Sequence, residues 1–236
     1  MGKAKNTRLF RAVKEESQRK IESLLKELKS TNENSLHHFK GLSVADSLLN
    51  AIGRTTIDKN ISYICMGTKG SSAIKEVFMG SSTVSVMKHI DFCPLIAVPE
   101  NYSFDLPAKI AFATNFEHTY TQVELIPLID LAKLCSSEIA IVHVDTGKGL
   151  TTPQTTSKKL LAKRFAGLHH QFVEVKGKNK ISEAIKSFAS ETKEIGMIAM
   201  INYWHSFFEK LTKEEVVKKI TFTTEVPFLI LPLISP

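Results

Sequence analysis

The chain has 236 residues, of which 43% are hydrophobic, so it can bury the core of one large or two small domains. Its 23% of charged residues is close to the globular average, which excludes a disordered chain. Cys65, Cys93 and Cys135 are far apart and form no Cys-x-x-Cys pair. This spacing argues against a disulfide scaffold or a zinc site and favours a reducing, cytoplasmic setting.

The net charge of +7 comes largely from lysines between Lys3 and Lys29. Few aromatic residues accompany them, so we expect a solvated helix face and no nucleic-acid partner. The basic stretch 1–11 has no apolar run behind it, so no signal peptide is expected. The most apolar stretch, 226–234, is broken by two prolines and is shorter than the roughly 20 residues of a membrane span, so no membrane partner is expected.

Helices and short strands are predicted to alternate in the first 100 residues. Apolar residues at helical spacing predict a long first helix, and the continuous apolar run ISYICM predicts a buried parallel strand. The predicted elements are a helix over 7–29, a strand over 35–41, a helix over 44–57, a strand over 61–66, a helix over 81–90 and a strand over 95–98. Residues 99–107 are predicted to be a linker.

The same alternation starts again after the linker. Thr152 followed by Pro153 is typical of a helix start, and Pro127 falls inside a predicted helix. The strands are predicted over 109–114, 139–144, 172–175, 195–201 and 228–231, and the helices over 120–134, 155–165, 181–192 and 213–220. Strands that alternate with helices predict an α/β fold with an open, mostly parallel, doubly wound sheet.

The two halves repeat each other. ISYICM at 61–66 aligns with IGMIAM at 195–200, and CPLIAVP at 93–99 aligns with VPFLILP at 226–232. The spacing between these anchors differs by a single residue. A repeat of this length is too long for a solenoid and indicates two tandem units.

A glycine-rich loop carries the chemistry of the first unit. Gly67 and Gly70 follow the buried strand directly, and Gly80-Ser81-Ser82 lies where the next helix begins. Glycines let backbone N–H groups approach an anion, and the N-terminus of the following helix favours phosphate. The alternative is a turn that merely connects strand and helix. The loop holds no Gly-Lys-Ser/Thr and is therefore not a Walker A motif.

The pattern G-x2-G-x9-G-S, preceded by an apolar strand and followed by VMKHIDFCPLIAVP, resembles the universal stress protein family. The passage KIAFATNF resembles its first strand, and LAKLCSSEIAIVHV resembles one of its helix–strand passages. The resemblance implies a Rossmann-like fold of the adenine nucleotide alpha hydrolase type and a cytoplasmic role in the stress response. It also implies that ATP or AMP, with Mg²⁺, binds at Gly67, Thr68, Gly70, Gly80, Ser81 and Ser82. A chain without cofactor is the alternative.

The second unit departs from the family pattern. Asn115 stands where the family's first strand ends in Asp. Ile201, Trp204 and Glu214 stand where the first unit has Gly67, Gly70 and Gly80. Bulky side chains would fill the phosphate cradle, and the acidic group would repel phosphate. We expect no nucleotide in this second loop.

The first unit has an intact loop but an incomplete sheet. Residues 1–100 lack the family's first strand, first helix and second strand, whereas 106–236 holds a complete unit. The remaining pieces cannot form the family's normal five-stranded sheet. Either the chain is a truncated product or the strands come from elsewhere.

Histidines and the tryptophan are expected to be structural. His143 is predicted to be a strand residue near the core, and Trp204 a core or interface anchor. His37-His38 and His169-His170 recur at matching strand starts, with no acidic or cysteine neighbour to complete a metal site. Neither a Ser-His-Asp order nor paired carboxylates stand out, so a non-enzymatic role is expected. A pure interaction module is the main alternative, and a weak nucleotide hydrolase ranks third.

The last strand of each unit predicts how the chain assembles. The strands 95–98 and 228–231 come last in their units, are uncharged, and must be covered or paired. The resemblance implies that they pair antiparallel inside one chain, as a pseudo-dimer. The strands missing from the first unit leave further groups unpaired, so we also expect a homodimer.

Overall fold

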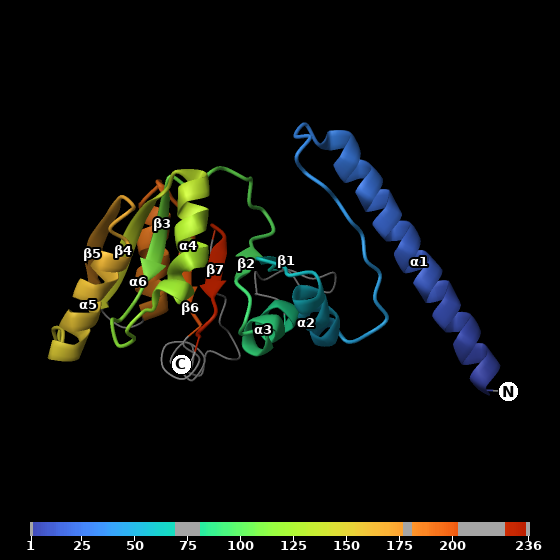
Figure 1. Ribbon diagram of the computed structural model, residues 1–236, viewed down its shortest axis with the longest axis horizontal. Helices are drawn as coiled ribbons and strands as arrows, with labels where there is room; N and C mark the ends of the chain where they lie inside the picture. Colours follow the sequence, from blue (N-terminus) through green and yellow to red (C-terminus); the bar gives the residue numbers. More distant parts are fainter. Residues whose placement is uncertain (1, 69–80, 177–180, 203–224, 235–236) are drawn as a thin grey trace. The chain divides into compact units, whose positions relative to one another are not determined.

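The computed structural model describes residues 2–68, 81–176, 181–202 and 225–234 (Figure 1). Two compact units make up the chain, residues 1–54 and residues 55–236. The first holds the long helix α1 (Gly2–Thr31) and most of α2 (Leu48–Asp58). The second holds all the described strands. Among the described helices, none combines the length and the apolar character that crossing a membrane requires.

One seven-stranded sheet forms the centre of the larger unit (Figure 1). Its order is β1-β2-β7-β6-β3-β4-β5, and every neighbouring pair is parallel except β2 and β7. The strands are β1 (Ile64–Gly67), β2 (Leu95–Val98), β3 (Lys109–Ala113), β4 (Glu138–Asp145), β5 (His170–Lys176), β6 (Ile195–Ile201) and β7 (Phe228–Leu231). The predicted α/β fold with a mostly parallel sheet is confirmed.

The antiparallel contact lies where the two predicted tandem units meet. Leu95, Ile96 and Ala97 of β2 face Ile230, Leu229 and Phe228 of β7. The predicted antiparallel pairing of these strands is therefore confirmed. It joins the two strands of the first half to the five strands of the second half in one continuous sheet.

Backbone hydrogen bonds repeat on both sides of this contact. The N–H of Ile64 donates to Pro94 O at 2.8 Å, and the N–H of Ile198 donates to Pro227 O at 3.0 Å. Past the strand ends, Thr68 N donates to Val98 O at 2.9 Å and Asn202 N donates to Leu231 O at 2.8 Å. These matches follow the sequence alignment residue by residue. They support a duplication, whereas the boundaries 1–100 and 106–236 remain predictions.

Helices cover the sheet according to the direction of each crossover. The helices are α3 (Ser81–His89), α4 (Gln122–Cys135), α5 (Thr152–Arg164) and α6 (Ile181–Glu191). The strands β3, β4 and β5 follow one another in one direction across the sheet, so right-handed crossovers place α4 and α5 on one face. The chain then returns past β3 to β6, so the right-handed crossover through α6 places this helix on the other face. The predicted helix over 213–220 lies outside the described residues.

The core is built mainly by the second half. Leu125, Leu128 and Phe112 are fully buried in it, and Tyr63 and Ile96 of the first half pack against the same cluster. The hydroxyl of Tyr63 also donates to the carbonyl of Pro127, inside α4, at 2.7 Å. The two halves thus share one core.

In the smaller unit, the predicted strand over 35–41 is wrong. Residues 32–47, here called the return segment, contain no strand. Asn34 accepts from Leu36 N at 2.9 Å and closes a turn. Beyond the turn, Gly41 lies so close to α1 that an added Cβ would come within 2.2 Å of Ile21. Local side-chain hydrogen bonds and packing on α1 replace strand pairing.

Several element boundaries also differ from prediction. The second helix begins at Leu48 rather than at residue 44, because the side chains of Asp46 and Ser47 accept from backbone N–H groups there. The cap of α5 is Thr151, not Thr152, and it forms a capping box with Gln154. The predicted match of histidine pairs at strand starts holds for His170 in β5 but not for residues 37 and 38.

The β2–β7 register can be tested with paired cysteines. Ile96 and Leu229 form a pair without mutual hydrogen bonds, because their backbone groups point to β1 and β6, and such pairs approach to about 4.5 Å between Cα atoms. We expect Ile96→Cys with Leu229→Cys to form a disulfide under mild oxidation. Mass spectrometry of the linked peptides identifies it. Ala97→Cys with Leu229→Cys is the control, since these side chains lie on opposite faces, and equal linkage in both variants would contradict the register.

Candidate nucleotide site

The end of β1 and the start of α3 form the candidate site of the first half. The hydroxyl of Thr83, buried in the first turn of α3, donates to the carbonyl of Gly67 at 2.9 Å. Thr68 is buried, whereas Gly67 and Ser82 are exposed. Ser81 is the first residue of α3. The structure thus brings Gly67, Thr68 and the helix start together, while Gly70 and Gly80 lie outside the described residues.

The charge distribution at this helix start suits an anion. The first turn of α3 has no acidic residue, and Lys88 and His89 lie in its last turn. The first N–H groups of a helix have no partner within the helix and carry the positive end of its dipole. An exposed Ser82 adds a hydroxyl next to these groups. The arrangement can bind a phosphate without a metal ligand from the protein.

In the second half, an apolar side chain fills the position that corresponds to Gly67. Ile201 aligns with Gly67, ends β6, and is buried in the hydrophobic core. Asn202 aligns with Thr68, is also buried, and donates from Nδ2 to Met87 O at 2.9 Å. Trp204 and Glu214 lie outside the described residues. Of the three glycine positions of the first loop, the one that can be compared is open at Gly67 and packed into the core at Ile201.

The carboxyl ends of β3 and β6 form the switch point of the sheet, where open α/β folds bind ligands. Thr114 and Asn115 follow β3, and Asn202 follows β6. Asn115 holds its own loop, since Oδ1 accepts from Glu117 N at 3.0 Å and its carbonyl accepts from Gln154 Nε2 at 2.9 Å. Within the part of the chain that the structure describes, Asn202 Oδ1 is buried without a hydrogen-bond partner.

The loop after β3 is held in an unusual conformation. Phe116 has a left-handed backbone, with φ at +58°, and its ring is buried. Thr114 Oγ1 accepts from Phe116 N at 2.9 Å and also bonds the hydroxyl of Tyr120. The ring of Phe116 packs on His143, whose Nδ1 lies 3.1 Å from Thr114 O. His143 is therefore placed in β4 near the core, as predicted.

A buried carboxylate fastens the same end of the sheet. Glu124 is completely buried at the start of α4, where Thr121 N and Thr121 Oγ1 donate to Oε2 at 2.7 and 2.8 Å. His118 Nε2 lies 3.0 Å from Oε1, and Ile234 N donates to Oε1 at 3.3 Å. One side chain thus ties together the loop after β3, the start of α4 and the segment after β7.

This cluster is not among the sites expected from the sequence. The spacing Thr121-x-x-Glu124 is a capping-box signature that could have pointed to it. The contacts of His118 and Ile234 could not be read from the sequence, because they join residues far apart in the chain or without a common motif.

The three cysteine thiols are not activated as nucleophiles. Burial raises the pKa of the thiols of Cys65, Cys93 and Cys135 above the ordinary value, which lowers their thiolate content. Among the residues that the structure covers, no three His, Cys, Asp or Glu side chains gather closely enough to hold a metal ion.

Comparison with known proteins identifies the fold. No family model matches the chain, and no curated protein does. A universal stress protein from Archaeoglobus fulgidus DSM 4304 matches at a TM-score of 0.57 and 19% identity, over 92% of this chain and 77% of its own. A functionally unknown protein from Pseudomonas aeruginosa PAO1 matches at a TM-score of 0.56 and 14% identity, over 91% of this chain and 77% of its own. The chain has the fold of universal stress proteins, and the resemblance seen in the sequence is confirmed at that level.

Removal of the buried carboxylate should destabilise the fold. Glu124→Ala removes the buried carboxylate that accepts from Thr121 N, Thr121 Oγ1 and Ile234 N, so we expect a loss of about 2 kcal/mol in the free energy of unfolding. Glu124→Gln keeps one acceptor oxygen and should lose clearly less. Urea unfolding followed by circular dichroism measures both. Equal midpoints for the alanine variant and the unaltered chain would show that the cluster contributes nothing to stability.

Tyr120 should make stability fall in alkaline solution. Burial, together with the nearby Glu124 charge, raises the pKa of its phenol in the folded state, although the Thr114 hydrogen bond opposes the shift. The unfolded phenol ionises near its ordinary pKa of about 10, so the free energy of unfolding falls as pH rises above that value. Tyr120→Phe should remove up to about 1.4 kcal/mol per pH unit of this slope. Urea unfolding at pH 9 to 11 measures it, and an unchanged slope would contradict this assignment.

Proposed function

We propose that this chain is a universal stress-type protein that binds adenine nucleotide, ATP or AMP, at the loop between β1 and α3. The observation that carries the proposal is the junction at Gly67, where Thr83 holds the acid-free start of α3 against the end of β1. The role is non-enzymatic and belongs to the stress response in the cytoplasm. ATP would be accompanied by Mg²⁺, which the phosphates themselves hold.

The contrast between the two halves supports the first loop as the site. Gly67 is exposed at the end of β1, whereas Ile201 at the end of β6 lies in the core. The first loop also has Gly80 where the second has Glu214, a residue that repels phosphate. The nucleotide phosphates are therefore assigned to Gly67, Thr68, Gly70, Gly80, Ser81 and Ser82.

A second candidate function is an interaction module that has lost nucleotide binding. It is favoured by the β2–β7 contact, which makes one sheet of the two halves, and by the exposed apolar residues of α1. In this reading the fold supplies surfaces for self-association as a homodimer or for a partner protein. Both functions are compatible with the sheet, and nucleotide titration separates them.

Isothermal titration with ATP and Mg²⁺ is the decisive experiment. We expect saturable binding, and we expect Gly80→Glu to abolish it, because the added carboxylate occupies the phosphate position and repels the ligand. Glu214→Gly, the reciprocal exchange in the second loop, is the matched control and should leave the affinity unchanged. Binding that survives Gly80→Glu would show that another site is used. Absence of binding to the unaltered chain would leave the interaction module.

A further inference from the structure

We propose that α1 forms an antiparallel pair with α1 of a second copy of this chain. The proposal gives a surface to the self-association proposed above. It does not depend on nucleotide binding, and a chain that fails to bind ATP would still form this pair.

The return segment covers only part of the apolar stripe of α1. Ile21 and Leu25 are half-buried where Gly41 lies against them, and Ser17 is bonded to Ser43 at 2.9 Å. Beside this strip, Leu9, Val13 and Leu24 are 64%, 61% and 53% exposed. These three fall on one side of the helix, with Leu9 and Val13 toward its N-terminal end and Leu24 toward its C-terminal end.

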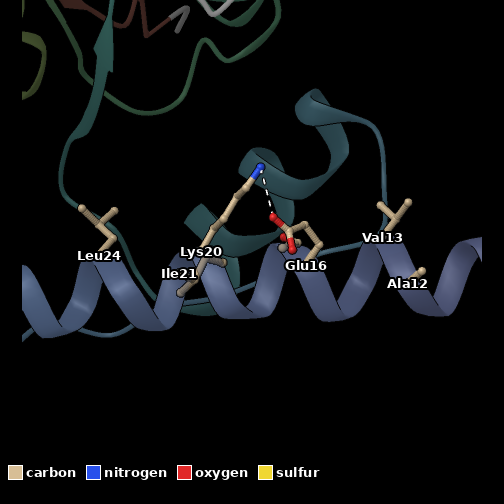
Figure 2. A pocket seen from close by; sticks show the side chains of 7 residues that line it. Ala12, Val13, Glu16, Lys20, Ile21 and Leu24 are labelled. Carbon is tan, nitrogen blue, oxygen red and sulfur yellow. Dashed lines mark ion pairs between the residues drawn. The ribbon is translucent and has the colours of Figure 1, made fainter.

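An open groove of about 640 Å³ follows this surface (Figure 2). Val13, Ile21 and Leu24 supply its apolar lining, and Glu16 and Lys20 lie between them. Figure 2 shows Val13, Glu16, Lys20 and Leu24 projecting from the same side of α1. The groove therefore has apolar ends and a centre that carries one negative and one positive charge. A partner surface has to match this pattern.

The spacing of these residues is self-complementary. Val13 and Leu24 lie at equal distances from a midpoint between residues 18 and 19, and Glu16 and Lys20 are almost symmetric about the same point. A two-fold axis through this point would place Val13 of each copy opposite Leu24 of the other, and Glu16 near the other copy's Lys20. A parallel pair would instead place Glu16 against Glu16 and Lys20 against Lys20. Isologous pairing of this kind closes as a dimer.

The charges along the whole helix favour the same direction. Residues 2–14 carry five basic residues and no acidic one, and all four glutamates of α1 lie between Glu15 and Glu27. Antiparallel pairing about this axis places residues 6–14 opposite residues 23–31, where Glu27 lies between Lys26 and Lys29, so the two basic halves do not face each other. Parallel pairing would bring the two basic halves together, which costs free energy.

Light scattering coupled to size exclusion tests the pair on the full chain, whose monomer mass is 26.3 kDa. We expect a concentration-dependent dimer, and Leu24→Lys should weaken its dissociation constant roughly a hundredfold, because two leucine contacts are lost per dimer. Leu24 is 53% exposed, so an unchanged circular dichroism spectrum and unfolding midpoint would show that the variant still folds. A monomer at all concentrations, or a dimer indifferent to Leu24→Lys, would overturn the proposal.

Charge exchange and cross-linking test the direction. Glu16→Lys alone should weaken the dimer roughly tenfold, and Glu16→Lys with Lys20→Glu should restore it, because each new charge again meets its opposite. A mixture of Val13→Cys and Leu24→Cys chains should form a disulfide between residues 13 and 24, identified by mass spectrometry. A disulfide between two residues 13 would indicate a parallel pair and overturn the proposal.

Discussion

The structure depends on the antiparallel pairing of β2 with β7. All other neighbouring strands are parallel and belong to one half of the chain, so this contact alone makes the sheet continuous. Both strands are short, apolar and uncharged, and each would expose unpaired backbone groups if it ended a sheet. Their pairing satisfies both sets of groups at once. The two strands of the first half therefore extend a complete five-stranded arrangement of the second half.

This arrangement gives the two halves different tasks. The second half supplies the main core, Glu124 ties the loop after β3 to the segment after β7, and Ile201 stands where the first half has Gly67. The first half adds little to the core but keeps the open strand end and the acid-free helix start. The open loop of the first half and the packed position of the second half are thus parts of one sheet.

The strands were predicted best where hydrophobic patterning and the internal repeat pointed to the same residues. The strand 95–98 and the strand 228–231 have the predicted bounds, because prolines limit short apolar runs on both sides. The antiparallel pairing followed from the family resemblance. The strand predicted over residues 35–41 is not formed, because the apolar content of a short segment does not show whether a partner strand is present. In the Glu124 cluster, the capping box with Thr121 is visible in the sequence, whereas the contact with Ile234 is not, because only the tertiary fold brings that segment to the start of α4.

The position of β7 in the chain also has a consequence for the order of folding. The contact between Ile96 and Leu229 joins residues that are far apart in sequence, and β7 follows every other described strand along the chain. Two strands alone are marginal in water, so β1 and β2 have no stable sheet to join until β7 is available. The second half, whose strands are all close in sequence, can form its core first. During synthesis, the edge of β2 therefore stays unpaired until β7 has been made. The nascent chain is most prone to misassembly in this interval.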